Sequence, residues 1–274
     1  MKKIMILLSV LLLMSGYAYA FELDNYFGVN LTVNSDGEFN MPWDPVQGYM
    51  MHENWRTDGD ENAPDPGPLY GISEAFDIEA MYMDFDYANN QLVYSIVTSM
   101  PNTGYDQVGW YPGYVFRAGD IKFIVGSNRY VVSTFGGTYA GYGYSAGDLY
   151  LNPNMGYYDG YRGFGYRGNP VLANYSQNSH RLSTTSGFYF NYVNYGLVEN
   201  GFDTYLMEGR IDFADLGGLS MLSNGVTMKL AMSCNNDIAI LDGAATVVPE
   251  PSTMILMGLG LAGLYGKRRF RRKK

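Results

Sequence analysis

The stretch FDIEAMYMDFDYANNQLVYSIVTS, residues 76–99, decides the fold. Its two halves, Phe76–Phe85 and Gln91–Ser99, are apolar runs rich in β-branched and aromatic residues, as is typical of strands. The polar segment between them, Asp86–Asn90, has the composition of a turn. Two strands joined by a short polar turn predict an antiparallel hairpin, and therefore β structure rather than helix.

Similar apolar runs occur along the rest of residues 21–248, and no long segment between them has apolar residues at helical spacing. Two of these runs flank Ser127-Asn128 in a further short hairpin, where Gly126 at the end of the first run can adopt a positive φ. Phe213–Leu216 predicts one short turn or helix. The pattern predicts an all-β fold with a single antiparallel β-sandwich, jelly-roll-like in architecture. The further predicted strands are residues 26–34, 120–126, 129–135, 187–195, 203–213, 226–234 and 237–241.

Residues 136–168 form a Gly/Tyr-rich insertion in this pattern. One interpretation is an exposed insertion whose tyrosines fold back over the sandwich. The other is an adhesive or carbohydrate-contacting loop that uses tyrosine as a rigid amphipathic contact.

The first 20 residues have the layout of a secretory signal peptide. Lys2 and Lys3 precede the apolar run Ile4–Met14, and Ala18-Tyr19-Ala20 forms a small-residue cleavage site. We expect cleavage between Ala20 and Phe21. Export therefore requires a translocase and a signal peptidase.

The end of the chain, residues 249–274, combines three unlike pieces. Pro249, Glu250 and Pro251 form a short extended segment, because the prolines fix φ and prevent a helix from continuing. Ser252–Gly266 predicts a transmembrane helix of about 22 Å, which flanking basic side chains extend by snorkelling. These charges also keep the tail cytoplasmic; they are Lys267, Arg268, Arg269, Arg271, Arg272, Lys273 and Lys274.

This ordered triple resembles the PEP-CTERM sorting signal of Gram-negative bacteria. The resemblance covers Pro249–Lys274 and implies that a membrane-embedded exosortase recognises the tail and processes the chain near Pro249, Glu250 and Pro251. It also implies a transient inner-membrane anchor, followed by transfer of the ectodomain to the cell surface or extracellular matrix, the setting of exopolysaccharide and biofilm.

A second resemblance rests on residues 75–101 and on DTYLMEGRIDFADLGG, residues 203–218. These segments look like the β-sandwich of family 9 carbohydrate-binding modules and DOMON-like domains. The ligand-binding aromatic residues of those modules have no match in this sequence. The resemblance therefore implies a fold and identifies no ligand.

The ectodomain, residues 21–248, is strongly acidic. It contains 26 acidic and nine basic residues, so its formal charge is −17. A nucleic-acid partner is not expected, because phosphate binding requires a basic patch. A single cysteine, Cys234, and two scattered histidines, His52 and His180, exclude an internal disulfide and a Cys/His zinc site of standard spacing.

Two groups of residues are candidate binding sites. Asp58, Asp60, Glu61 and Asp65 lie in the Gly/Pro-rich loop 57–68, where hard oxygen ligands could bind structural Ca²⁺; the alternative is a solvated acidic turn. No other cofactor is expected. The second group could stack on sugar rings or could pack into the core or its rim, and it consists of Trp43, Trp55 and Trp110.

The sequence predicts a non-enzymatic, exosortase-processed surface or extracellular-matrix protein. One alternative is a carbohydrate-binding module acting on the cell's own polysaccharide, and a second is a secreted hydrolase. A nucleophile elbow is absent around Ser179 and His180. Carboxylate pairs such as Asp84 and Asp86 arise by chance in so acidic a chain. No catalytic residue is therefore predicted.

Overall fold

The structure is a computed structural model of the chain. It describes residues 22–33, 35, 44–52, 78–106, 115–139, 142–156, 172–174, 180–182, 189–199, 202–232 and 238–246.

The predicted hairpin is present and lies at the centre of the fold. Strand β2 (Ile78–Asp86) pairs antiparallel with β3 (Gln91–Thr98), with a bulge between Ile78 and Ala80. The turn is closed by Asp86, whose Oδ1 accepts hydrogen bonds from the amides of Ala88 and Asn89, both at 3.1 Å. This side chain-to-backbone bonding is the usual reason for aspartate at the start of a turn.

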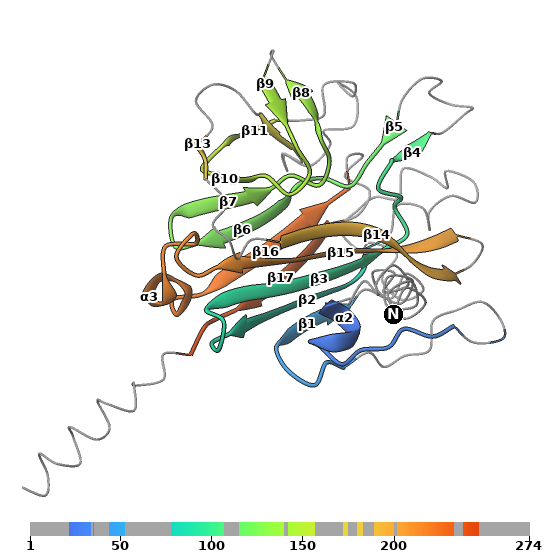
Figure 1. The fold of residues 1–274 in the computed structure, drawn as a ribbon, viewed down its shortest axis with the longest axis horizontal. Helices are drawn as coiled ribbons and strands as arrows, with labels where there is room; N and C mark the ends of the chain where they lie inside the picture. Colours follow the sequence, from blue (N-terminus) through green and yellow to red (C-terminus); the bar gives the residue numbers. More distant parts are fainter. Residues whose placement is uncertain are drawn as a thin grey trace, which may run out of the picture.

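Two antiparallel sheets form the sandwich (Figure 1). The first has the order β1-β2-β3-β15-β14, with β1 at Tyr49–His52, β14 at Tyr189–Glu199 and β15 at Phe202–Asp212. The second has the order β13-β10-β7-β6-β16-β17. The all-β sandwich prediction is confirmed. Strands of the second sheet are β6 (Ile121–Val125), β7 (Asn128–Val132), β10 (Leu149–Leu151), β13 (His180–Arg181), β16 (Val226–Ala231) and β17 (Ile238–Gly243).

The remaining elements are short. Gly126 has φ +59° in the turn between β6 and β7, as predicted, and a turn occupies Phe213–Leu216. In the described part of the chain, no helix is long and apolar enough to span a membrane; the predicted helix Ser252–Gly266 lies outside it. The short elements are α2 (Glu22–Asn25), α3 (Leu219–Leu222), and the pairs β4 (Tyr105–Asp106) with β5 (Val115–Phe116), β8 (Gly137–Tyr139) with β9 (Tyr142–Tyr144), and β11 (Asn154–Gly156) with β12 (Leu172–Asn174).

The main core lies between the two sheets. Tyr94 of β3 meets Phe123 of β6 edge to face, with ring centroids 5.1 Å apart. The Tyr94 ring crosses β15 at Gly209, where a Cβ would lie 2.6 Å from Tyr94 Cζ and 2.5 Å from the Tyr189 carbonyl oxygen. Glycine is therefore required at this position. Other members of this core include Met81, Met83, Phe85, Ile96, Met207, Val125, Val132, Leu149, Met228 and Leu241.

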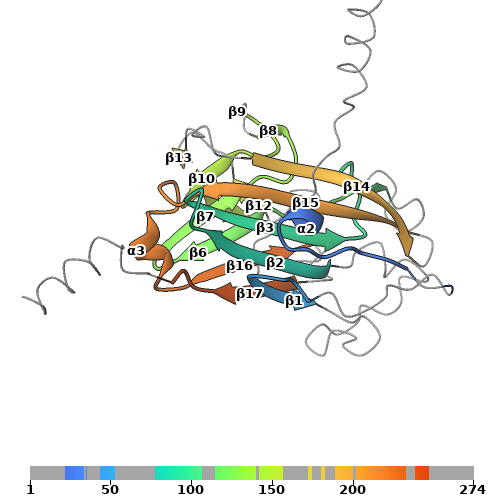
Figure 2. The same cartoon turned by 60° about the horizontal axis from the view of Figure 1, so that its bottom comes forward.

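The outer face of the first sheet is also buried. It presents Ala80, Tyr82, Val93, Val97 and Leu206, and these pack against four side chains from the N-terminal part of the chain, none more than 4% exposed. We call this covering segment, Glu22–Val33, the N-terminal strap; its α2 lies over this face (Figure 2). Its packed side chains are Leu23, Phe27, Val29 and Leu31.

The prediction of a strand at residues 26–34 is wrong in its described part, because residues 26–33 do not form a named strand. Gly28 has φ +69°, and Val29 donates a backbone hydrogen bond to Leu23 O rather than to a neighbouring strand. The β-branched and aromatic residues that suggested a strand instead bury themselves against the sheet. A segment that packs on a sheet face and a strand within the sheet are both rich in apolar residues, so composition does not distinguish them.

The interpretation of residues 136–168 as an exposed insertion is wrong for residues 149–151. Strand β10 lies within it and pairs with β7 as a member of the second sheet. Leu149 and Tyr150 are 0% and 4% exposed. The tyrosine alternates with leucines there, so this short stretch has the period of a strand despite its glycine-rich flanks.

The strand directions define two ends of the sandwich. The β2–β3 turn, α3 and residues 244–246 lie at one end, which we call the exit end, and β4 and β5 lie at the other (Figure 1).

Candidate site at the two ends of the sandwich

The residues predicted to bind calcium or sugar, to be cleaved, or to serve in sorting lie outside the described part of the chain. The structure therefore does not test the calcium, tryptophan or processing predictions. It describes instead the residues nearest to the two predicted processing points, Glu22 and Thr246. The predicted residues in question are Ala20, Phe21, Trp43, Trp55, Asp58, Asp60, Glu61, Asp65, Trp110, Pro249, Glu250, Pro251, Lys267, Arg268, Arg269, Arg271, Arg272, Lys273 and Lys274.

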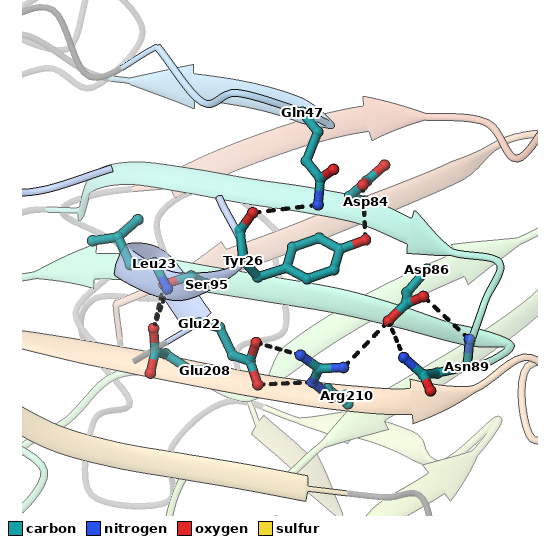
Figure 3. A network of polar contacts seen from close by, with 10 residues as sticks. All are labelled: Glu22, Leu23, Tyr26, Gln47, Asp84, Asp86, Asn89, Ser95, Glu208 and Arg210. Atoms are coloured by element: carbon teal, nitrogen blue, oxygen red, sulfur yellow. Dashed lines mark hydrogen bonds and ion pairs between the residues drawn. The ribbon is translucent and has the colours of Figure 1, made fainter. Parts of the chain in front are cut away.

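At the N-terminal end, Glu22 is bound by an arginine of the sheet. Arg210 Nε and Nη2 donate to Glu22 Oε1 and Oε2, both at 2.7 Å (Figure 3). Arg210 Nη1 also donates to Asp86 Oδ2 at 3.3 Å. The bidentate geometry is the strong form of an arginine–carboxylate pair. It fixes the first turn of the strap to β15 and to the β2–β3 turn.

Glu208 lies beneath α2 and is fully buried. Its Oε1 accepts a hydrogen bond from the Leu23 amide at 2.8 Å and one from Ser95 Oγ at 3.2 Å (Figure 3). Oε2 has no hydrogen-bond partner among the described residues. Burial raises the pKa of Glu208 to about 7, against the lowering effect of the Leu23 and Glu22 amides and of Ser95. Desolvation outweighs hydrogen bonding at this carboxyl.

Other polar groups of the strap pair with the sheet as well. Tyr26 Oη donates to Asp84 Oδ2 at 2.9 Å, and Arg210 lies over the Tyr26 ring at 5.5 Å from its centroid. Burial, with the Asp84 carboxylate second, raises the pKa of Tyr26. Tyr195 Oη donates to Asp24 Oδ1 at 2.7 Å. The strap is thus held by directional contacts around its apolar centre.

At the C-terminal end, three consecutive residues are held by three different elements. Tyr49 Oη donates to Ala244 O at 2.9 Å, the Ala245 amide donates to Leu222 O at 3.2 Å, and the Thr246 amide donates to Tyr87 Oη. Ala245 is 5% exposed. The chain is therefore attached to the sandwich up to Thr246.

The β2–β3 turn joins these two ends. Asp86 binds the arginine that holds Glu22, and its neighbour Tyr87 accepts the hydrogen bond from Thr246. The same turn thus contacts both the start and the end of the described ectodomain. Within the described ranges, no group of three or more His, Cys, Asp or Glu side chains could hold a metal ion. Chemically, the arrangement can hold two chain ends in place.

Reasoning from the sequence missed this network. One available signal was the alternation of Glu208 and Arg210 on a predicted strand, which places two charges on one sheet face. Another was the nearly continuous apolar run in each strand of the central hairpin, which is typical of strands covered on both faces. Neither signal identifies the strap as the partner, because that contact spans 185 residues in the case of Leu23 and Glu208.

Comparison with known proteins bears on the tail. A family profile for the PEP-CTERM protein-sorting motif matches residues 247–272. No curated protein and no solved structure matches the chain, so the resemblance to family 9 carbohydrate-binding modules stays a prediction. The chain therefore carries a PEP-CTERM protein-sorting motif directly after its β-sandwich, which supports an exported, exosortase-sorted surface protein.

Proposed function

We propose that this chain is a non-enzymatic surface or extracellular-matrix protein whose sandwich is delivered by exosortase processing. One observation carries the proposal: the sorting motif begins at residue 247, directly after Thr246, the last described residue, which is hydrogen-bonded to the sandwich. The sandwich is thus one folded unit with the sorting motif attached at its exit end.

In this proposal, the signal peptide directs export and is removed before Phe21. The apolar run Ser252–Gly266 then retains the precursor in the inner membrane, and the basic cluster after it keeps the tail cytoplasmic. Exosortase acts near Pro249, Glu250 and Pro251, after which the sandwich reaches the cell surface or matrix.

The absence of an enzymatic role is supported by how the described acids of the strap region are used. Glu22 and Asp86 bind Arg210, Asp84 binds Tyr26, and Glu208 accepts from the strap and from Ser95. Each of these carboxylates contributes to docking the strap. A glycoside hydrolase of the usual kind would require a pair of carboxyl groups facing its substrate.

The test replaces Pro249, Glu250 and Pro251 by alanine in the full chain. The extended recognition segment is lost while the apolar run remains, so an uncleaved, membrane-held precursor should accumulate. Immunoblots of membrane and surface fractions measure it. The matched control replaces the next two residues, Ser252 and Thr253, by alanine and should be processed normally. Unchanged release of the ectodomain from the first variant would refute the proposal.

A further inference from the structure

Very little chain separates the sandwich from the sorting motif. Only Val247 and Val248 lie between Thr246 and Pro249. A residue spans at most about 3.6 Å, so Pro249 is within about 11 Å of Thr246. A domain of this size has a radius of gyration of about 17 Å. An enzyme that binds the PEP segment therefore works next to the exit end of the sandwich.

Residues 244–246 do not easily detach from the sandwich, so the chain between the sandwich and the sorting motif stays short. Freeing Ala244–Thr246 would break three hydrogen bonds, made by Tyr49, Leu222 and Tyr87, and would expose the buried Ala245. The motif is thus presented from a fixed point.

The surface around this point has the composition of a protein-binding patch. Tyr49 and Tyr87 are 38% and 41% exposed, although each uses its hydroxyl to hold the chain end. Tyrosine is enriched among the residues that dominate protein interfaces. We call Tyr49, Tyr87 and Ala244–Thr246 the exit surface.

The charges near the exit surface argue against a lipid partner. Asp86 precedes Tyr87, and Asp242 lies two residues before Ala244. Arg210, the cation bound to Asp86, is already paired with Glu22. Anionic headgroups attract basic segments and repel acidic ones. A protein surface is the better match.

We propose that exosortase contacts the exit surface, through Tyr49 and Tyr87, in addition to the sorting motif. This inference rests on the proposed function. The two contacts are joined by two residues, so that the second forms at high effective concentration once the first is made. The folded sandwich is then part of the substrate.

The test compares rates of precursor processing in cells that contain exosortase, by pulse-labelling the full chain. Tyr49→Ala and Tyr87→Ala should each slow processing at least about fivefold, as expected for loss of an interface anchor worth more than 1 kcal/mol. Tyr49→Phe and Tyr87→Phe keep the rings but lose the hydroxyls that hold the chain end, so each should slow processing less than the corresponding alanine variant does. The matched control is Tyr189→Ala, which removes a tyrosine of equal exposure, 38%, from β14 at the opposite edge of the first sheet. Resistance of each precursor to limited proteolysis checks that it is folded.

A second arm inserts ten Gly/Ser residues between Thr246 and Val247. The spacer uncouples the sandwich from the motif, so Tyr87→Ala should have little further effect in this background. An equal effect of Tyr87→Ala with and without the spacer would overturn the proposal, because the coupling would then be absent.

Three other outcomes would also overturn it. The first is normal processing of both alanine variants, and the second is equal slowing by Tyr189→Ala. The third is protection of Tyr49 and Tyr87 from nitration when precursor without exosortase is placed in phosphatidylglycerol–phosphatidylethanolamine vesicles, which would assign the surface to lipid. Processing that survives replacement of Pro249, Glu250 and Pro251 would instead refute the proposed function itself.

Discussion

Glu208 joins the strap to the first sheet through a side chain that can gain or lose a proton. Its carboxyl is fully buried, accepts the Leu23 amide through Oε1, and has no described partner for Oε2. Burial raises its pKa from 4.5 to about 7. The folded protein therefore retains a proton that the unfolded chain releases at lower pH.

This residue predicts a specific pH dependence of stability. Between pH 4.5 and 7 the unfolded state ionises at Glu208 while the folded state stays protonated, so rising pH favours unfolding. The loss should reach roughly 3 kcal/mol by pH 8, since each pKa unit corresponds to about 1.4 kcal/mol. Glu208→Gln keeps the acceptor for Leu23 and cannot ionise. Urea unfolding at pH 5 and pH 8 should show a smaller decrease in this variant than in wild type.

Glu22→Gln is the control for this prediction. It weakens the bidentate pair with Arg210 and should lower the free energy of unfolding by about 1–3 kcal/mol, the range for hydrogen bonds to charged groups. The decrease between pH 5 and pH 8 should persist in that variant. Identical decreases in wild type and Glu208→Gln would show that Glu208 ionises normally in the fold.

At the scale of elements, the N-terminal strap makes the first sheet a middle layer. Its inner face packs on the second sheet, and its outer face packs under Leu23, Phe27, Val29 and Leu31. Phe27 is 0% exposed and lies 5.5 Å from the Tyr82 ring, centroid to centroid. The strap therefore contributes a second, smaller core.

Phe27→Ala should destabilise the protein by about 3–5 kcal/mol, the usual cost of removing a buried phenylalanine side chain. The lost free energy combines the burial of the Phe27 ring with the cost of the cavity that its removal leaves over Tyr82. Urea unfolding followed by circular dichroism measures it. Val46→Ala is the control: Val46 is 75% exposed and adjoins the strap, and its removal should change stability by less than about 0.5 kcal/mol. Equal effects of the two changes would refute the strap's role as a core element.

The elements that the sequence predicts correctly are those with local determinants. Each hairpin is specified by two apolar runs and a turn residue, such as Asp86 between β2 and β3 or Gly126 between β6 and β7. The strap and β10 required long-range information. Residues 26–33 have strand composition and yet cover a sheet face, and β10 is hidden among glycines yet pairs with β7.

At the scale of the whole molecule, the prediction from sequence succeeds for sorting and is weaker for sites. The PEP-CTERM motif is a contiguous pattern, so the sequence is sufficient to find it. The network around Glu22, Arg210 and Asp86 joins residues up to 188 positions apart, and only the fold brings them together. The charge of −17 is likewise a property of the ectodomain as a whole and not of any single motif.

This charge gives the calcium prediction its physical basis. A bound Ca²⁺ at Asp58, Asp60, Glu61 and Asp65 would relieve repulsion, and a hundredfold excess over Kd stabilises by about 2.7 kcal/mol. Millimolar Ca²⁺ should therefore raise the melting temperature by a few degrees, and Asp58→Ala with Asp60→Ala should abolish the shift. Mg²⁺ at matched ionic strength is the control, because it demands tight octahedral geometry. Equal shifts with both ions would mean screening alone.

The attachment of Thr246 at the end of β17 also determines how the sandwich would respond to mechanical tension. For a domain held by its C-terminal end, force enters along the axis of β17, since this strand runs directly to the exit. Its six register pairs with β16 are the first backbone ladder that such a force reaches. Tyr49 and Tyr87 pass part of the force to the first sheet. A force applied at Thr246 is therefore shared between the two sheets.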